Sequence, residues 1–222
     1  MLRKFGRLLG INKLLRRILD LKGYENQFHQ RMINKLQEKD IFWDVGSNQG
    51  EIVKKVKSFF NCNVYCVAFE PHPDLSANLK KLSFKNYKVI NAALSDKVGK
   101  AEFVYGSDTM QTTGKLDTST RKKQNKTLVQ EIDIRYALKV LNLKCPNLIK
   151  IDVEGHEYEI LNSILLNLEN LKILRFIFVE IHLSILDKRG LTIQMKDVIE
   201  KFELETNFEF KWIDVSHFIL ER

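Results

Sequence analysis

The chain has 222 residues, of which 44% are hydrophobic and 29% charged, and this composition suits a folded domain with a substantial core. No apolar run approaches the ~20 residues that a membrane-spanning helix needs, and the basic N-terminus lacks the continuous apolar stretch of a secretory signal. The three cysteines, Cys62, Cys66 and Cys145, have a spacing that fits neither a zinc site nor a redox pair. We therefore predict buried, reduced thiols in a cytoplasmic protein.

The net charge of +8 is concentrated at the N-terminus. Residues 1–22 contain seven basic side chains and one acidic one, so they carry +6 and the rest of the chain carries only +2. A nearly neutral body argues against nucleic-acid binding, which needs a basic surface on the folded domain. Residues 1–22 are expected to form two short helices with apolar and basic sides. Such helices either present a solvated charged face or bind peripherally to an anionic membrane, here at its inner surface.

Strands and helices are predicted to alternate after a helical N-terminal extension. A third helix is expected near residues 25–38, so we divide the chain into an extension, residues 1–38, and a main domain, residues 39–222. The first half of the main domain is predicted to form strand, helix, strand, helix and strand, over residues 41–45, 51–60, 64–69, from Pro73, and 87–92. Such alternation predicts a parallel sheet with helices on both faces.

The pattern changes after residue 95. An extra strand is expected at residues 100–105, and residues 107–126 are polar without periodicity, which predicts a long loop that serves as a lid, a binding loop or a mobile segment. The regular pattern then returns as strand, helix, strand, helix and C-terminal hairpin, over residues 148–153, 156–168, 173–181, 193–204, and 208–215 with 217–220. The pattern as a whole predicts a doubly wound α/β domain.

The strongest local motif is Asp44-Val45-Gly46-Ser47-Asn48-Gln49-Gly50, which lies between a predicted strand and a predicted helix. Its glycines allow a tight turn and a close approach of a ligand to the backbone. Glu70 ends the next strand, 20 residues after Gly50, where a doubly wound fold places a carboxylate against ribose hydroxyls. The loop alone is compatible with a structural turn, but loop and acid together predict an adenosine-containing cofactor.

The loop differs from the nicotinamide fingerprint G-x-G-x-x-G, because it reads G-x-N-x-G. Asp44 lies two residues before the first glycine, and a carboxylate there suits a ligand with an ammonium and a sulfonium group better than a pyrophosphate. S-adenosylmethionine is therefore the favoured cofactor. A nicotinamide-dependent oxidoreductase and a non-catalytic cofactor- or nucleic-acid-binding module remain as alternatives.

Five motifs resemble those of the FkbM-type methyltransferases in order and spacing over residues 41–182: DVGSNQG, AFEPHP, NAALSD, IKIDVEGHE and VEIH. The resemblance implies a class I methyltransferase (Rossmann-like) fold with a mostly parallel seven-stranded sheet, S-adenosylmethionine as cofactor, and O-methylation of a hydroxyl on a sugar, glycan or other small molecule. It also implies a set of cofactor-binding residues: Asp44, Gly46, Ser47, Asn48 and Gly50 at the methionine end, Glu70 at the ribose, Ala93 at the adenine and Asp152 at the methyl group. Residues outside 41–182 match no family motif, so the acceptor stays open.

Methyl transfer to an alcohol needs close alignment of the acceptor oxygen and removal of its proton. Four candidates follow the carboxyl ends of two predicted strands, where ligands of open α/β sheets bind: Glu154, His156, Glu180 and His182. We predict His182 as the base, because the pKa of histidine lies near neutrality, with Glu180 orienting it or contacting the acceptor. His156 has an alternative role at the start of a helix.

A divalent metal is an alternative that the sequence does not lead us to expect. Asp152, Glu180 and His182 could hold an ion that polarises the acceptor oxygen, but no pattern in the sequence fixes the ligand geometry of such a site. His217 is predicted to lie at the surface or in an interface. The oligomeric state is left open.

Overall fold

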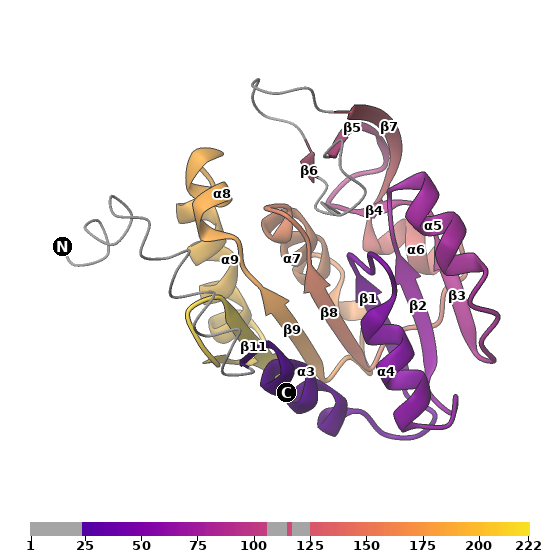
Figure 1. Cartoon of the computed structure of the whole chain (residues 1–222). Helices are drawn as coiled ribbons and strands as arrows, with labels where there is room; N and C mark the ends of the chain where they lie inside the picture. The colour runs from indigo at the N-terminus through magenta and orange to yellow at the C-terminus, as the bar shows by residue number, and fades with distance from the viewer. Residues whose placement is uncertain (1–23, 106–114, 117–124) are drawn as a thin grey trace. The chain divides into compact units, whose positions relative to one another are not determined.

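The computed structural model describes residues 24–105, 115–116 and 125–222 (Figure 1). The chain divides into two compact units, and the second unit is Leu36–Arg222. In the first unit the described helix is α3, Tyr24–Lys35, within the predicted range 25–38 apart from its first residue. The two predicted helices of residues 1–22 lie outside the described residues. No helix in the described part of the chain is long and apolar enough to cross a membrane.

A seven-stranded sheet forms the centre of the second unit, as predicted. Its order is β10-β11-β9-β8-β1-β2-β3, and all neighbouring strands run parallel except those that pair with β11. The strands are β1 Ile41–Val45, β2 Tyr65–Phe69, β3 Tyr87–Ile90, β8 Leu148–Asp152, β9 Phe176–Glu180, β10 Glu209–Trp212 and β11 His217–Glu221. β1 and β8 lie in the middle and are almost completely buried, which explains their nearly continuous apolar sequences.

Helices cover both faces of this sheet, so the predicted doubly wound architecture is confirmed. In Figure 1, α4 lies in front of the sheet, whereas α7 and α9 pass behind it. The helices are α4 Glu51–Phe59, α5 Pro73–Lys80, α6 Ile134–Lys139, α7 Glu157–Leu165, α8 Leu183–Lys188 and α9 Thr192–Glu205, with a 3-10 turn at Leu168–Asn170. The thiols differ from the prediction, because Cys66 alone is buried and Cys62 and Cys145 are partly exposed.

A second, four-stranded sheet occupies part of the region predicted as a long loop. Its order is β4-β7-β5-β6, with strands β4 Ala93–Leu94, β5 Gly99–Tyr105, β6 Lys115–Leu116 and β7 Asn125–Ile132. β5 and β7 pair antiparallel along the full length of β5. The loop prediction was therefore wrong for the first two residues of β7, and it was also wrong for the residues of β6, which form a strand. The other residues of the predicted loop lie outside the described residues.

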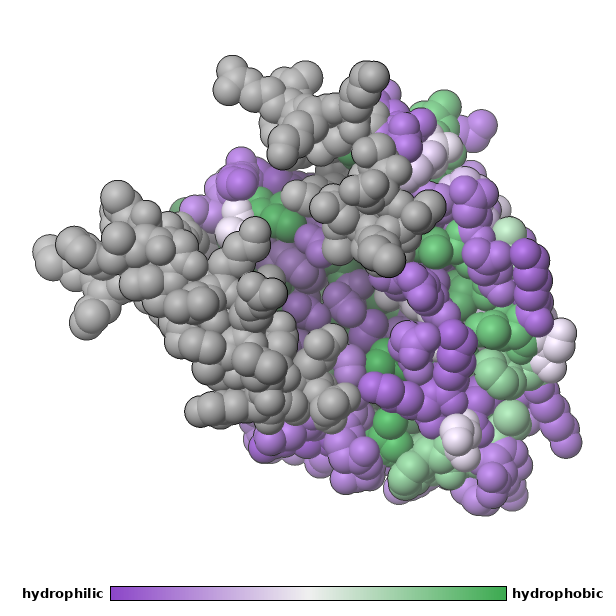
Figure 2. Space-filling model, viewed as in Figure 1, coloured by the Kyte–Doolittle hydropathy of each residue, from purple (hydrophilic) through white to green (hydrophobic). Residues whose placement is uncertain are grey.

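Strand register brings charged residues together at the carboxyl edge of the main sheet. Asp44 of β1 is paired with Lys150 of β8, and Asp152 of β8 is paired with Glu180 of β9. The carboxyl ends of β1, β8 and β9 lie at the same edge of the sheet because these strands are parallel. On the face drawn in Figure 2, hydrophilic side chains gather where β1 and β8 end. A functional site is therefore expected at this edge of the sheet.

Candidate functional site

The predicted glycine loop turns directly against the end of β8. Gly46 has a φ of +80°, and a Cβ added there would lie 2.0 Å from the carbonyl oxygen of Asp152. Gly50 has a φ of +76° and comes immediately before α4, and its Cβ would lie 2.6 Å from a methyl carbon of Leu79. Both positions favour glycine for its left-handed backbone and for the close approach of neighbouring atoms.

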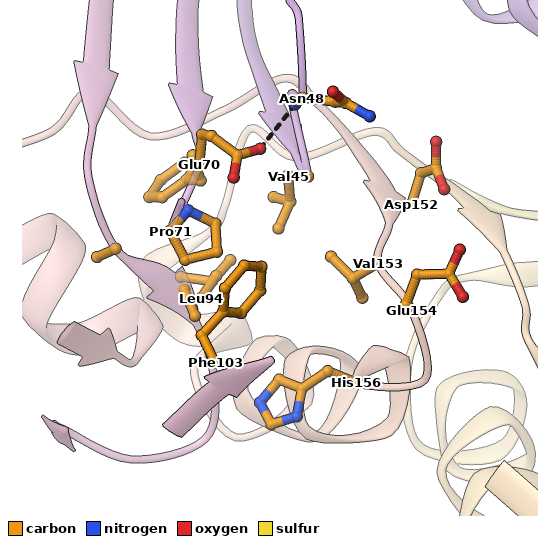
Figure 3. Close-up of a pocket in the computed structure, with 14 residues that line it drawn as sticks. Val45, Asn48, Glu70, Pro71, Leu94, Phe103, Asp152, Val153, Glu154 and His156 are labelled. Carbon is orange, nitrogen blue, oxygen red and sulfur yellow. Dashed lines mark hydrogen bonds between the residues drawn. The ribbon is translucent and has the colours of Figure 1, made fainter. Parts of the chain in front are cut away.

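Glu70 links the end of β2 to the glycine loop. Its Oε2 accepts a hydrogen bond of 2.8 Å from the backbone N–H of Asn48 (Figure 3). Its Oε1 accepts one of 2.9 Å from the N–H of His72. Burial raises the pKa of this carboxyl to about 7, although both hydrogen bonds oppose the shift. The side chain is thus held in one position beside the loop.

A cavity of about 770 Å³, including the part open to solvent, lies beyond these strand ends. One wall is apolar and contains Pro71, Leu94 and Phe103, while Asp152 and Glu154 lie on the opposite side (Figure 3). A concave site with apolar lining and a few polar groups is typical of small-molecule binding. Seven of the predicted site residues line it: Gly46, Asn48, Glu70, Ala93, Asp152, Glu154 and His156.

Four other predicted site residues, Asp44, Gly50, Glu180 and His182, are not among the lining residues, and neither is Ser47. The Oγ of Ser47 donates a 2.7 Å hydrogen bond to the carbonyl oxygen of Asp44, so it stabilises the loop from within. Phe103 was predicted to lie in a strand but not in the site. It reaches the cavity because β5 belongs to the second sheet, which the sequence did not predict.

Lys150 is a charged residue in the site that sequence reasoning missed. Its ammonium is buried between two carboxylates, 3.3 Å from Oδ1 of Asp44 and 3.1 Å from Oδ2 of Asp152. Burial disfavours the charged amine, but the two carboxylates outweigh that effect and raise its pKa. A lysine in the middle of the apolar strand LIKID was the signal that could have identified it, because a buried lysine needs a partner.

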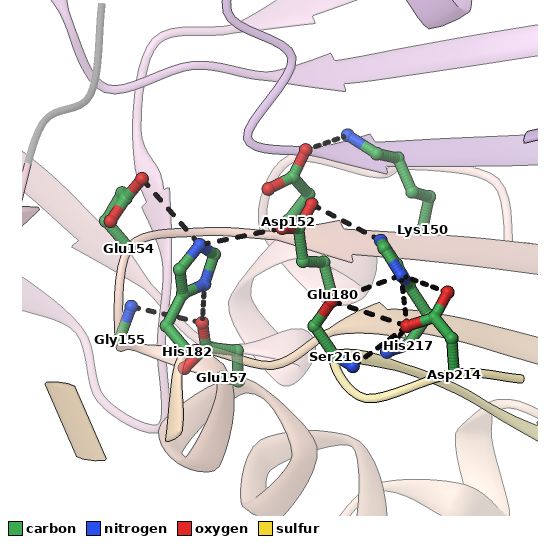
Figure 4. A network of polar contacts seen from close by, with 10 residues as sticks. All are labelled: Lys150, Asp152, Glu154, Gly155, Glu157, Glu180, His182, Asp214, Ser216 and His217. Atoms are coloured by element: carbon green, nitrogen blue, oxygen red, sulfur yellow. Dashed lines mark hydrogen bonds and ion pairs between the residues drawn. The ribbon is translucent and has the colours of Figure 1, made fainter. Parts of the chain in front are cut away.

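Three of the four predicted catalytic residues converge in a second cluster (Figure 4). The Nε2 atom of His182 lies 3.7 Å from Oε1 of Glu154 and 3.9 Å from Oε1 of Glu180. Its Nδ1 lies 2.6 Å from Oε1 of Glu157, a fully buried carboxylate whose contact with this histidine the sequence did not indicate. Burial opposes protonation of the ring, but the hydrogen bond to Glu157 and the neighbouring charges raise the pKa of His182 to about 9.

His217 does not lie at the surface, contrary to the prediction. It is buried, with Nδ1 2.8 Å from Oδ2 of Asp214 and Nε2 3.6 Å from Oε2 of Glu180. Glu180 therefore lies between two histidines, His182 and His217 (Figure 4).

His156 belongs to a different group from His182. Its Nε2 lies 2.9 Å from Oγ of Ser95, and its Nδ1 lies 3.4 Å from Oε2 of Glu159. Burial lowers the pKa of His156. The structure thus separates two histidines that the sequence had placed in one set of candidates.

The protein has a class I methyltransferase architecture. This architecture combines a glycine loop beside β8, an acidic residue at the end of β2 and a cavity beyond the strand ends. The SAH-bound methyltransferase PaMTH1 from Podospora anserina has the same fold, with a TM-score of 0.51 and 11% identity over 88% of this chain and 76% of that one. The model of the FkbM methyltransferase domain matches residues 44–211. The chain belongs to the FkbM methyltransferase family.

A relative with a described activity is the hexuronic acid methyltransferase AglP from Haloferax volcanii. It is 29% identical to this chain over 172 residues, which are 76% of this chain and 66% of AglP. The matched part thus spans just under two thirds of the relative's length.

Proposed function

We propose that the protein is an S-adenosylmethionine-dependent O-methyltransferase whose acceptor is a hydroxyl of a sugar or glycan. Family membership supports methyl transfer, and the similarity to a hexuronic acid methyltransferase favours a sugar acceptor. The observation that carries the proposal is the close approach of the loop at Gly46 to β8, with Glu70 beside this loop on the same cavity.

The residues of the cavity fit S-adenosylmethionine. Gly46 lines the cavity without a side chain to fill it, and the carboxylate of Glu70 is an acceptor for ribose hydroxyls. The apolar wall suits the adenine ring, and Asp152, which lines the cavity, supplies negative charge for the cationic end, while Asp44 lies behind it and pairs with Lys150. When bound, this cofactor supplies an electrophilic methyl group to a nucleophilic oxygen.

The acceptor proton is proposed to leave toward the cluster around His182. Glu154 lines the cavity and is the member of this cluster that a bound hydroxyl would meet first. Glu180 and His182 lie behind it, and Glu157 fixes the orientation of the His182 ring, which was one of the two roles expected of Glu180 from the sequence. These roles are proposals for Glu154, Glu180 and His182, and His156 is proposed to border the cofactor.

Calorimetry tests the proposal directly. Titration of the full chain with S-adenosylmethionine and with S-adenosylhomocysteine is expected to show one site per chain, whereas NAD gives no heat. Mass spectrometry of sugar and glycan acceptors incubated with the enzyme is then expected to show products heavier by one methyl group. A folded protein that binds NAD but neither methionine-derived nucleoside would overturn the assignment.

We further propose that residues 39–222 form the catalytic domain and residues 1–38 an extension that attaches peripherally to anionic membranes. The charge of +6 on residues 1–22 supports the attachment. Such a location suits an acceptor linked to a lipid.

A further inference from the structure

Three side chains at the carboxyl ends of β8 and β9 offer a set of ligands for a metal ion. One ligand atom from each of Asp152, Glu180 and His182 can be chosen so that all three lie within 4.8 Å of one another. Two of the residues are neighbours across the parallel pair of strands, and the third follows Glu180 by two positions. The set contains an imidazole as well as carboxylates, which favours first-row divalent ions such as Mn²⁺ over Ca²⁺.

The orientation of His182 is the second observation that points to a ligand. Its Nδ1 is bound by the fully buried carboxylate of Glu157, which also accepts a hydrogen bond from the N–H of Gly155 at 3.1 Å. The other ring nitrogen, Nε2, is therefore directed at the carboxylates of Glu154 and Glu180 (Figure 4). A carboxylate behind the far nitrogen is the usual way in which proteins orient a histidine that binds a metal.

The side chains around this cluster have an excess of negative charge, which favours the binding of a cation. Among the described residues, Lys150, His182 and His217 form ion pairs with six carboxyl groups around this cluster. Even with both histidines protonated, three positive groups face six acidic ones: Asp44, Asp152, Glu154, Glu157, Glu180 and Asp214. A bound divalent ion would reduce this excess and would also attract an acceptor that carries oxygen ligands or negative charge.

We propose that Asp152, Glu180 and His182 bind a divalent first-row cation that holds the acceptor sugar by its oxygens. This inference rests on the proposed function, because the role of the ion is to polarise the acceptor hydroxyl so that its proton is lost more easily. The side chains of Asp152 and Glu180 are 36% and 21% exposed, so they can shift to close around an ion, whereas His182 is held in place. Glu154 is then the group that receives the proton.

Mn²⁺ binding to the full chain, without cofactor or acceptor, tests the site independently of catalysis. Electron paramagnetic resonance is expected to show one bound ion per chain. Electron spin-echo envelope modulation of the bound Mn²⁺ should then show a coupling to an imidazole nitrogen of His182. The coupling should disappear in His182→Ala. Absence of bound Mn²⁺ in the folded protein, or bound Mn²⁺ without the nitrogen coupling, overturns the inference.

Matched variants locate the ion. Glu180→Gln and Glu157→Gln should weaken Mn²⁺ binding about tenfold or more, the first by removing a ligand and the second by releasing the histidine that it orients. Asp214→Asn makes the same change of charge at a neighbouring histidine and should alter the affinity less than about twofold. Equal weakening by all three variants would indicate unspecific attraction and refute the site.

The proposed function and the metal site can fail separately. S-adenosylhomocysteine binding measured with chelator present reports the cofactor site alone. If that ligand binds and Mn²⁺ does not, the methyltransferase proposal stands and the metal site is wrong. If neither binds to a protein whose thermal unfolding is cooperative, both are wrong.

Discussion

Gly46 and Glu70 are single residues on which the proposed cofactor site depends for opposite reasons. Gly46 contributes by the absence of a side chain, and Glu70 by a carboxylate that two backbone N–H groups hold in place. Both were predicted from the sequence, because glycine spacing after a strand and an acid at the next strand end are local patterns. Lys150 and Glu157 were missed, because their roles depend on partners across the fold.

Replacing Gly46 by alanine should destabilise the protein and remove cofactor binding. The new Cβ would lie 2.0 Å from the carbonyl oxygen of Asp152, and the φ of +80° disfavours any residue with a Cβ, at a cost of about 1–2 kcal/mol before the clash is counted. Thermal unfolding and calorimetry with S-adenosylhomocysteine measure both effects. Gly99→Ala is the matched control, since a Cβ there meets no atom within 4 Å. An unchanged affinity in Gly46→Ala would contradict the assigned loop.

Cofactor affinity should fall as the pH drops below about 7. Burial raises the pKa of Glu70 from its ordinary 4.5 to about 7, with Asp44 adding to the shift and Lys150 opposing it, so the carboxylate proposed to accept ribose hydrogen bonds is lost below that pH. The effect of Glu70 on folding stability has the opposite pH dependence. The buried ionised group costs stability above pH 7, and this cost disappears as the pH falls from about 7 toward 4.5.

Calorimetry from pH 6 to pH 8 measures the predicted change in affinity, and Glu70→Gln serves as the comparison. The variant should bind about 10–100-fold more weakly at pH 8, as expected for a lost hydrogen bond to a charged group. Its affinity should also depend less on pH. A wild-type affinity that is constant over this range would exclude Glu70 as the ribose acceptor.

At the scale of elements, the pairing of β1 with β8 determines the electrostatics of the site. The register opposes Asp44 to Lys150, and the ammonium bridges to Asp152 two residues further along β8. Strand pairing of this kind cannot be inferred from either strand alone. The same limit applies to the second sheet, because β7 is half exposed and its sequence NKTLVQEI lacks a strong apolar pattern.

Replacing Lys150 by methionine should lower the free energy of unfolding by about 3–5 kcal/mol, because it leaves the buried carboxylate of Asp44 without its cation. Urea denaturation followed by circular dichroism measures this loss. Lys172→Met, at an exposed position, should change stability by less than about 0.5 kcal/mol. A similar small effect for both variants would mean that Asp44 is not ionised in the folded protein.

At the scale of the whole molecule, the charge is distributed unevenly between the N-terminus and the remainder of the chain. Residues 1–22 carry most of the net charge of +8, whereas the main domain combines a nearly neutral composition with an acidic cluster at its strand ends. Attraction to anionic lipid would therefore come from the N-terminal segment and not from the surface around the cavity.

Deletion of residues 1–22 should abolish binding to anionic vesicles while leaving S-adenosylhomocysteine binding unchanged. The seven basic side chains contribute about 1 kcal/mol each near such a surface, and the attraction is screened by salt. Co-sedimentation with vesicles of phosphatidylglycerol, and with neutral phosphatidylcholine as the control, measures the difference. Equal sedimentation of the full and shortened chains would refute peripheral attachment through this segment.

The sequence by itself determined the alternation of strands and helices around the main sheet, apart from α6 and α8, together with the glycine loop and the acid at the end of β2. These features depend on hydropathy and residue spacing within short segments, which a sequence displays directly. The tertiary structure decided which charged groups meet: Lys150 between two carboxylates, Glu157 behind His182, and His156 in a separate group. Those contacts depend on strand register and on burial, which arise only when distant segments pack together.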